Sequence, residues 1–184
     1  MKIIAGMYKG FCLNTFSGKD IRPTPSKVRE AIFDMLGPSI VESDFLDIFA
    51  GTGAIGIEAF SRGAKQVTFV EINQRSIRLI KQNLLKIYHE DFSDIIKNDF
   101  HKALKRLSEQ KRRYDIIFLD PPYNKDYPVK TLTGIDQSRI FKKKSIIILQ
   151  HHVNEKVQGN FKKLKLIKEK KYGKSAITVF RYQE

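Results

Sequence analysis

The sequence predicts an α/β fold in which a mostly parallel sheet carries helices on both faces. Short apolar strand patterns alternate with amphipathic helix patterns from residue 44 to about residue 153, and such alternation is typical of a parallel sheet. The final strand patterns follow one another around a Tyr-Gly turn, so we expect that end of the sheet to be antiparallel. With 184 residues, 41% of them hydrophobic, the chain suits a single domain with a well-formed core.

The start of the chain predicts an extension over residues 1–37, ahead of a core over residues 44–184. Residues 3–16 hold two short apolar stretches around glycines, which is typical of a β-hairpin. The stretch that follows predicts a helix up to residue 37, with Thr24 as its N-cap and Pro25 at its first position.

The core pattern then repeats from strand to helix. Strands are expected over residues 44–50, 66–72, 93–99, 114–120 and 145–153, and helices over residues 54–62, 74–89, 101–111 and 129–140. The apolar stripe of the second of these helices recurs at three- and four-residue spacing, at Ile77, Ile80, Leu84 and Ile87. Residues 164–182 predict two further strands around Tyr172 and Gly173.

Acidic residues stand at or just beyond the carboxyl ends of the predicted strands. They are Asp47, Glu71, Asp99 and Asp120. Ligands of open parallel sheets bind beyond these ends, where the strand order changes direction. We therefore expect these carboxylates to surround one ligand site.

The sequence GTGAIG over residues 51–56 follows the first core strand and opens a helix. A G-x-G-x-x-G at this place lets the backbone approach a nucleotide-type cofactor closely. Glu71 stands twenty residues after Gly51, where its carboxylate can accept both hydroxyls of a ribose. The pattern fits a dinucleotide and S-adenosylmethionine (SAM) alike.

The neighbouring carboxylates favour SAM. Asp47 lies four residues before Gly51, where it would repel a pyrophosphate but attract the ammonium and sulfonium groups of SAM. Asp99 ends the third strand and is placed to accept a hydrogen bond from an adenine amino group. Both residues also suit structural roles, Asp47 as an acceptor for loop amides and Asp99 as the cap of the next helix.

The stretch IIFLDPPYNK over residues 116–125 ends a strand in a rigid turn, because prolines donate no hydrogen bond and restrict the backbone. The Asp120 carboxylate and the Pro121 carbonyl are placed to accept N–H bonds from an exocyclic amine and to stabilise charge developing on its nitrogen. Tyr123 is expected to stack on the base that carries the amine. This turn, which includes Pro122, is the candidate catalytic site.

The charge of the chain is strongly positive and unevenly distributed. The formal net charge is +14, and residues 141–184 carry twelve Lys and Arg against three Asp and Glu, whereas residues 1–44 carry six against five. This asymmetry favours a nucleic-acid partner. The single cysteine, Cys12, indicates a reducing, cytoplasmic setting. No apolar run reaches the length of a membrane span, and no residues have the spacing of a zinc site.

Taken together, these motifs resemble those of the RsmD family, bacterial enzymes that methylate N2 of a guanine in 16S rRNA. The matching stretches are IAGMYKG, RPTPSKVREAIFDML, LDIFAGTGAIGIEAFSRGA, FVEIN and LDPPY, in the family's order. The resemblance implies a Rossmann-like, seven-stranded fold of SAM-dependent methyltransferases. It also implies SAM as the cofactor, and 16S rRNA within the small ribosomal subunit or its assembly intermediate as the partner. A monomer is the default expectation.

The resemblance further implies roles for individual residues. Asp120, Pro121, Pro122 and Tyr123 would hold the guanine. The residues expected around SAM are Asp47, Phe49, Ala50, Gly51, Gly53, Glu71, Ile72, Asp99 and Phe100. Those expected to contact RNA are Lys9, Arg22, Thr24 and Lys125.

The sequence departs from the family pattern in two places. Phe11 follows Gly10 where a basic residue is common, and Gln150 precedes His151 where an acidic residue is expected. A role for an acid at that position is therefore in doubt for this chain. His151 and His152 are interpreted as strand-end packing or RNA-facing residues.

Other functions stay open at this point. An adenine-N6 methyltransferase acting on DNA would use a similar turn, although 184 residues leave no room for a separate DNA-specificity domain. A nicotinamide-dependent oxidoreductase would leave Asp47 and the Pro-Pro turn unexplained. A non-catalytic RNA-binding module would bind RNA without binding SAM.

Overall fold

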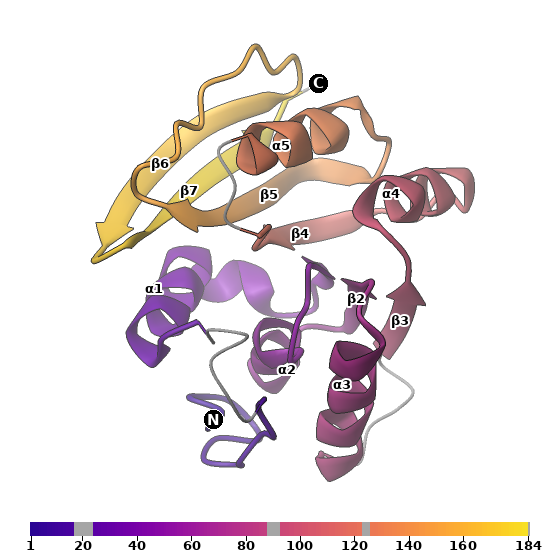
Figure 1. The fold of residues 1–184 in the computed structure, drawn as a ribbon, viewed down its shortest axis with the longest axis vertical. Helices are drawn as coiled ribbons and strands as arrows, with labels where there is room; N and C mark the ends of the chain where they lie inside the picture. Colours follow the sequence, from indigo (N-terminus) through magenta and orange to yellow (C-terminus); the bar gives the residue numbers. More distant parts are fainter. Residues whose placement is uncertain (17–23, 88–92, 123–125, 184) are drawn as a thin grey trace.

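A seven-stranded sheet forms the centre of the computed structural model, which describes residues 1–16, 24–87, 93–122 and 126–183 (Figure 1). The strand order is β3-β2-β1-β4-β5-β7-β6. The strands are β1 (Asp44–Ile48), β2 (Gln66–Glu71), β3 (Ser93–Lys97), β4 (Tyr114–Leu119), β5 (Phe141–His152), β6 (Leu164–Tyr172) and β7 (Ser175–Tyr182). Strands β1 to β5 pair in parallel, whereas β7 runs antiparallel to both β5 and β6. The predicted mostly parallel sheet with an antiparallel end is confirmed.

Helices cover both faces of this sheet. They are α1 (Ser26–Leu36), the 3₁₀ helix η1 (Gly37–Ile40), α2 (Ala54–Ser61), α3 (Gln74–Lys86), α4 (Phe100–Glu109) and α5 (Tyr127–Gln137). Along β4, Ile116 and Phe118 pack in a core layer with α1, α2 and α3, while Ile117 and Leu119 pack in a second layer with α4 and α5. This alternation follows from the two-residue period of side chains along a strand.

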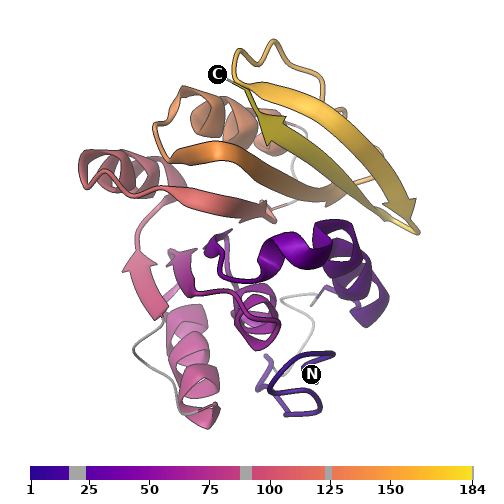
Figure 2. The same ribbon diagram turned by 180° about the vertical axis from the view of Figure 1, so that it is seen from behind.

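The N-terminal segment, residues 1–16, folds back on itself as the predicted hairpin does, but its pairing is short. Among the described residues it forms a single antiparallel bridge, between Lys2 and Cys12, flanked by the bonds from Ile3 N to the Phe11 carbonyl and from Leu13 N to the Met1 carbonyl. The N–H groups that follow bond to α2, since Ile4 and Ala5 donate to the Glu58 carboxylate and Met7 donates to the Ser61 carbonyl. Figure 2 shows this segment from behind, far from the β6–β7 edge of the sheet.

Glu58 is the buried anchor of this contact. Its side chain is 0% exposed, and its carboxylate accepts from Ile4 N at 2.8 Å, from Ala5 N at 3.0 Å and from Arg62 Nε at 2.8 Å. Gly6 makes the close approach possible, because a Cβ there would lie 1.7 Å from the Ser61 carbonyl oxygen. The division of the chain into an extension and a core stays a prediction, although Ile3 and Leu13 of the segment belong to the first core layer.

Several element boundaries differ from the predicted ones, among them those of α1, α5 and β5. Helix α1 begins at Ser26 without a side-chain cap, so Thr24 is not its N-cap and Pro25 precedes its first position. Helix α5 begins two residues earlier than expected, with Pro128 in its first turn, and ends at Gln137. Strand β5 begins at Phe141, four residues earlier than expected, and includes the three lysines that follow. Its pairing with β4 is irregular there, between the Tyr114–Phe141 pair and the Ile116–Ile146 pair.

We predict that Glu58→Ala lowers the free energy of unfolding by about 3–5 kcal/mol, because it leaves buried N–H donors and a buried arginine without their acceptor. Chemical denaturation measures the loss. The matched control is Glu109→Ala on α4, whose carboxylate is 65% exposed and whose ion pair with Lys105 contributes at most about 1 kcal/mol. Equal, small losses in both variants would show that the anchor contributes nothing.

Candidate functional site

The carboxyl ends of β1 and β4 lie side by side. Strand β1 pairs with β2 on one side and with β4 on the other, so the strand order changes direction between β1 and β4. Asp47 is paired with Phe118, and the N–H of Asp120 donates to the Ile48 carbonyl at 3.4 Å. The glycine loop after β1 and the Asp-Pro-Pro turn after β4 therefore share one edge of the sheet, as ligand sites of this fold class require.

The glycine loop turns through left-handed backbone conformations. Phe49, Gly51 and Gly53 have φ angles of 66°, 55° and 75°, which glycine adopts most readily. A Cβ at Gly51 would approach only the Phe49 carbonyl oxygen, at 3.9 Å, whereas one at Gly53 would lie 3.2 Å from the Ile80 side chain. Gly56 has a packing role, since its Cβ would lie 2.3 Å from the Phe69 ring. The loop thus leaves its backbone uncovered at Gly51, which is what close approach of a cofactor needs.

Asp47 is a buried carboxylate beneath this loop. It is 1% exposed, and its Oδ2 accepts a hydrogen bond from Gly56 N at 3.0 Å. Burial raises the pKa of Asp47 to about 8; the Gly56 hydrogen bond opposes this shift, and the charges of Asp120 and Glu71 add to it. Both interpretations of Asp47 fit: it accepts a loop amide, and its charged form would be stabilised by a nearby cation.

Glu71 ties the loop to the end of β2. Its Oε2 accepts from Gly51 N at 2.8 Å, and its Oε1 accepts from Ile72 N and Asn73 N, each at 2.8 Å. A carboxylate offers about four acceptor sites, so capacity remains for a ligand hydroxyl. Ile72 is 62% exposed beside it, which offers an apolar surface to a flat ring.

Asp99 caps α4, which confirms its predicted structural role. Its Oδ1 accepts from Lys102 N at 3.1 Å, and the helix begins at the next residue, Phe100. The Phe100 side chain is 5% exposed and packs against Phe49, with ring centroids 5.6 Å apart. Roles of Asp99 and Phe100 in cofactor binding stay predictions.

The Asp-Pro-Pro turn places a half-buried carboxylate next to polar side chains of other elements. Pro121 is buried and Pro122 exposed. Asp120 Oδ2 accepts from Gln150 Nε2 of β5 at 3.2 Å. Burial raises the pKa of Asp120 to about 7, with a hydrogen bond from Thr24 lowering it and the charge of Glu155 raising it.

Several side chains near the turn were missed by the sequence reasoning. Gln150 and Thr24 contact each other and surround Asp120, and the ring of Tyr127 stands edge-on to Phe49 at 6.2 Å. Gln150 was detectable in principle, because β5 follows β4 in the sheet and Leu149 is paired with Leu119. Thr24 was predicted as a helix cap and as an RNA contact, but its bonds to Gln150 and Asp120 were not predicted.

His151 packs at the end of its strand, as one of the two interpretations predicted. It is 2% exposed, its Nε2 lies 2.8 Å from Thr178 Oγ1, and its Nδ1 lies 3.0 Å from the His152 carbonyl oxygen. Burial lowers the pKa of His151, which favours a neutral ring. It is therefore directed away from Asp120 and toward β7.

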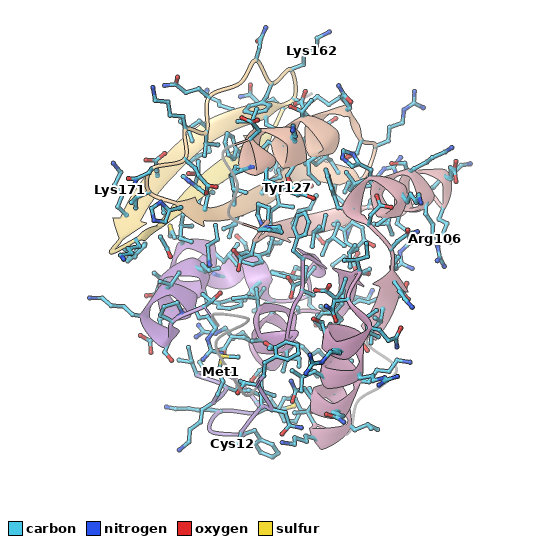
Figure 3. All side chains as sticks on the ribbon, in the orientation of Figure 1. Met1, Cys12, Arg106, Tyr127, Lys162 and Lys171 are labelled. Atoms are coloured by element: carbon cyan, nitrogen blue, oxygen red, sulfur yellow. The ribbon has the colours of Figure 1, made fainter. Side chains whose placement is uncertain are left out.

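The predicted RNA contacts are only partly described. Lys9 lies exposed in the N-terminal segment near Met7, which is 79% exposed, and Phe11, which is 47% exposed. Arg22, Tyr123 and Lys125 lie outside the described residues. Every residue from 165 to 171 in β6 is exposed, and Figure 3 shows Lys162 and Lys171 projecting outward from this end of the molecule.

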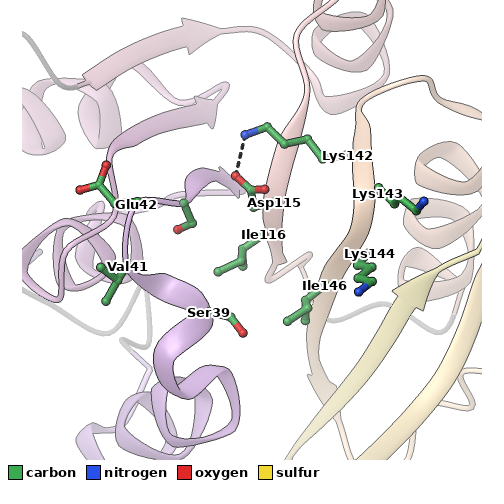
Figure 4. Close-up of a pocket in the computed structure, with 10 residues that line it drawn as sticks. Ser39, Val41, Glu42, Asp115, Ile116, Lys142, Lys143, Lys144 and Ile146 are labelled. Carbon is green, nitrogen blue, oxygen red and sulfur yellow. Dashed lines mark hydrogen bonds and ion pairs between the residues drawn. The ribbon is translucent and has the colours of Figure 1, made fainter.

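A separate hollow of about 330 Å³ lies at the opposite edge of the sheet, where β1, β4 and β5 begin (Figure 4). Lys142 there bonds to both Asp44 and Asp115. None of the predicted site residues lines it. In the described part of the chain, no group of three potential ligands gathers to hold a metal ion, and no helix is long and apolar enough to span a membrane.

Comparison with known proteins identifies the family. Residues 1–181 match the family described as "Conserved hypothetical protein 95". The protein named "Ribosomal RNA small subunit methyltransferase D" of Haemophilus influenzae is 34% identical over 152 residues, which cover 82% of this chain and 78% of that protein. The chain belongs to the RsmD family.

Two further similar proteins match along nearly the whole chain. A Bacillus subtilis protein named "Putative rRNA methyltransferase YlbH" is 32% identical over 181 residues, 98% of each chain. The solved structure titled "Putative methyltransferase yhhF from Escherichia coli" superposes with a TM-score of 0.86 at 27% identity and covers 100% of this chain and 98% of that one. The predicted Rossmann-like methyltransferase fold is thus confirmed.

We predict that stability falls as pH rises through the neutral range because of Asp47. The pKa of Asp47 is about 8 in the folded state, above its ordinary value of 3.8. The stability that this raised pKa contributes is therefore complete below pH 3.8 and is lost as the pH rises through the folded-state pKa. One such proton gives a slope of at most about 1.4 kcal/mol per pH unit.

Denaturation of the wild type and of Asp47→Asn across this pH range checks the prediction. The variant cannot titrate at this position, so its free energy of unfolding should depend less steeply on pH. Parallel curves for the two proteins would contradict the assignment of the raised pKa to Asp47.

Proposed function

We propose that this protein transfers the methyl group of SAM to the exocyclic N2 amino group of a guanine in 16S rRNA of the small ribosomal subunit. The observation that supports this most is the arrangement of two carboxylates of raised pKa, Asp47 beneath the glycine loop and Asp120 in the Pro-Pro turn, on adjacent parallel strands. The relatives named as methyltransferases of small-subunit ribosomal RNA support the substrate class.

The residues of the glycine loop fit SAM. Asp47 would hold its ammonium, the bare backbone at Gly51 would lie against its methionine part, and Glu71 would accept the ribose hydroxyls. Asp47 would repel a pyrophosphate when it is ionised and offers it no positive charge when it is protonated, which argues against a dinucleotide. When bound, SAM supplies a methyl group activated by a sulfonium.

The turn fits the amine. The lone pair of a guanine amino group is delocalised into the ring, so the group is a poor nucleophile until its nitrogen becomes pyramidal. Asp120 and the carbonyl of Pro121 would each accept one N–H bond, which turns the lone pair out of the ring plane and stabilises the positive charge that develops. As nitrogen bonds to the methyl carbon, the carbon–sulfur bond breaks, and a proton then leaves the nitrogen.

The basic surface fits RNA. The net charge of +14 would attract the phosphate backbone and make binding sensitive to salt. Lys9, Arg22 and Lys125 are the proposed RNA contacts, and Tyr123 is the proposed stacking residue. Thr24, the fourth proposed contact, bonds to Gln150 and to Asp120.

Isotope-labelled SAM tests the function directly. The substrates are undermethylated small subunits, naked 16S rRNA and DNA, each digested to nucleosides after the reaction. The expected product is labelled N2-methylguanosine from a ribosomal substrate. Label in N6-methyladenine from DNA would contradict the proposed substrate, and absence of label in all of them would contradict the proposed activity.

We predict that Asp120→Ala lowers the methylation rate by at least about 100-fold, because the variant loses the acceptor that stabilises charge on nitrogen. Its affinity for SAM should stay within a few fold of the wild type, since Asp120 acts on the other substrate. Steady-state methylation and calorimetric SAM titration measure the two effects. Full activity in this variant would refute the role of the turn.

Gly53→Val is the complementary variant. A β-branched residue is strained at φ 75°, and its Cβ would press against Ile80 at 3.2 Å. SAM affinity itself should fall, unlike in Asp120→Ala. Unchanged affinity in a folded variant would count against the glycine loop as the cofactor site.

A further inference from the structure

Gln150 lies against the catalytic turn from the neighbouring strand. It is 2% exposed near the end of β5, one residue after the Leu149–Leu119 pair that joins β5 to β4. Its Nε2 donates a hydrogen bond to Asp120 Oδ2 at 3.2 Å. A buried amide of this kind needs partners for both its ends, and the second partner is also present.

Thr24 is that partner. Its hydroxyl lies 3.5 Å from Gln150 Oε1 as a donor and 3.4 Å from Nε2 as an acceptor. Thr24 stands ahead of α1 and leaves the cap of that helix without a side-chain bond. The Thr24 hydroxyl therefore bonds within a polar cluster of Thr24, Gln150 and Asp120. This cluster joins the segment before α1, strand β5 and the turn after β4.

We propose that Gln150 is a positioning residue for Asp120: its amide occupies Oδ2 and so directs Oδ1 toward the substrate amine, while Thr24 fixes the orientation of the amide. The inference rests on the proposed function for its link to methylation, because it needs Asp120 to accept an N–H bond from the substrate. The effect of Gln150 on the protonation of Asp120 does not depend on the proposed function.

The chemistry of an amide explains why glutamine suits this position. The amide nitrogen donates at every pH, whereas a carboxyl group donates only while it is protonated. A carboxylate here would also add negative charge to a place already faced by Asp47 from β1 and by Glu155 from the segment after β5. Like charges so close together favour protonation of one of them.

The hydrogen bond from Gln150 affects how Asp120 is protonated, and the protonation state decides how well Asp120 accepts a substrate N–H. Because burial raises its pKa to about 7, the carboxylate and the neutral acid are both populated near neutral pH. A hydrogen bond donated to Oδ2 favours the charged form. The charged form keeps both oxygens as acceptors, whereas the neutral acid carries a proton that competes with the substrate N–H.

The test compares the wild type with Gln150→Met and Gln150→Glu. Methionine keeps the length of the side chain and removes the donor, and glutamate keeps the shape and adds a charge. The carboxyl carbon of Asp120 is followed by ¹³C NMR through a pH titration, with Asp120→Asn to assign the signal. The pH profile of kcat and the Kd for SAM are measured on the same proteins, and Gln137→Met, an exposed residue at the end of α5, is the matched control.

We expect the Asp120 titration midpoint to move to higher pH in both Gln150 variants, by about 0.5–1 pH unit for methionine and further for glutamate. At pH 7 kcat of the methionine variant should fall about two- to fivefold, and that of the glutamate variant further, with recovery at higher pH, while the Kd for SAM stays within twofold. Gln137→Met should behave as the wild type in every readout.

An Asp120 midpoint that is the same in wild type and in either folded variant would overturn the inference. So would a fall in activity with an unshifted pH profile, because that is what a merely structural role would give. If the methionine variant does not fold, the glutamate variant decides. If the wild type methylates no substrate, the proposed function fails, and the NMR titration still decides the role of Gln150 on its own.

Discussion

The parallel pairing of β1 with β4 is the constraint on which the site depends. It brings the loop over Asp47 and the turn at Asp120 to one edge of the sheet, although they are far apart in the sequence. Burial there raises the pKa of both carboxyl groups, to about 8 and about 7. A cation bound there would offset the cost of burying the charged carboxylates, so the site is electrostatically suited to a positively charged ligand and to a donor of N–H bonds.

A second set of buried polar contacts ties the chain's beginning to the same edge. Glu58 binds the backbone of the N-terminal segment, and Asn83 bonds both to Asn14 of that segment and to the Thr52 carbonyl in the glycine loop. Thr24 then reaches Gln150 and Asp120. The part of the protein proposed to meet RNA is therefore bonded directly to the parts proposed to hold the cofactor and the amine.

The core elements and the position of the candidate site were predictable from the sequence. The polar contacts between distant segments were not, for a physical reason. The periodicity predicted the order and type of the core elements. The glycine loop and the Asp-Pro-Pro turn predicted which strand ends lie side by side at the candidate site. The N-terminal hairpin has a shorter ladder than predicted, because the backbone donors of residues 4 and 5 bond to a buried side chain 54 and 53 positions away, and such partners leave no local pattern. Thr24 was misassigned for the same reason, since its partner Gln150 is 126 residues distant. Asp99 was open between two roles, and only the geometry showed that it caps α4.

Calorimetric titration of SAM at pH 7, in two buffers of different ionisation enthalpy, tests most directly whether this edge is built for a cationic methyl donor. Because the pKa of Asp47 is about 8 in the free protein, a bound ammonium and sulfonium should expel its proton, and SAM should bind with release of about one proton. Asp47→Asn should bind more weakly and release less. Binding of NAD in preference to SAM, or binding of SAM with the same enthalpy in both buffers, would contradict the electrostatic basis of the site.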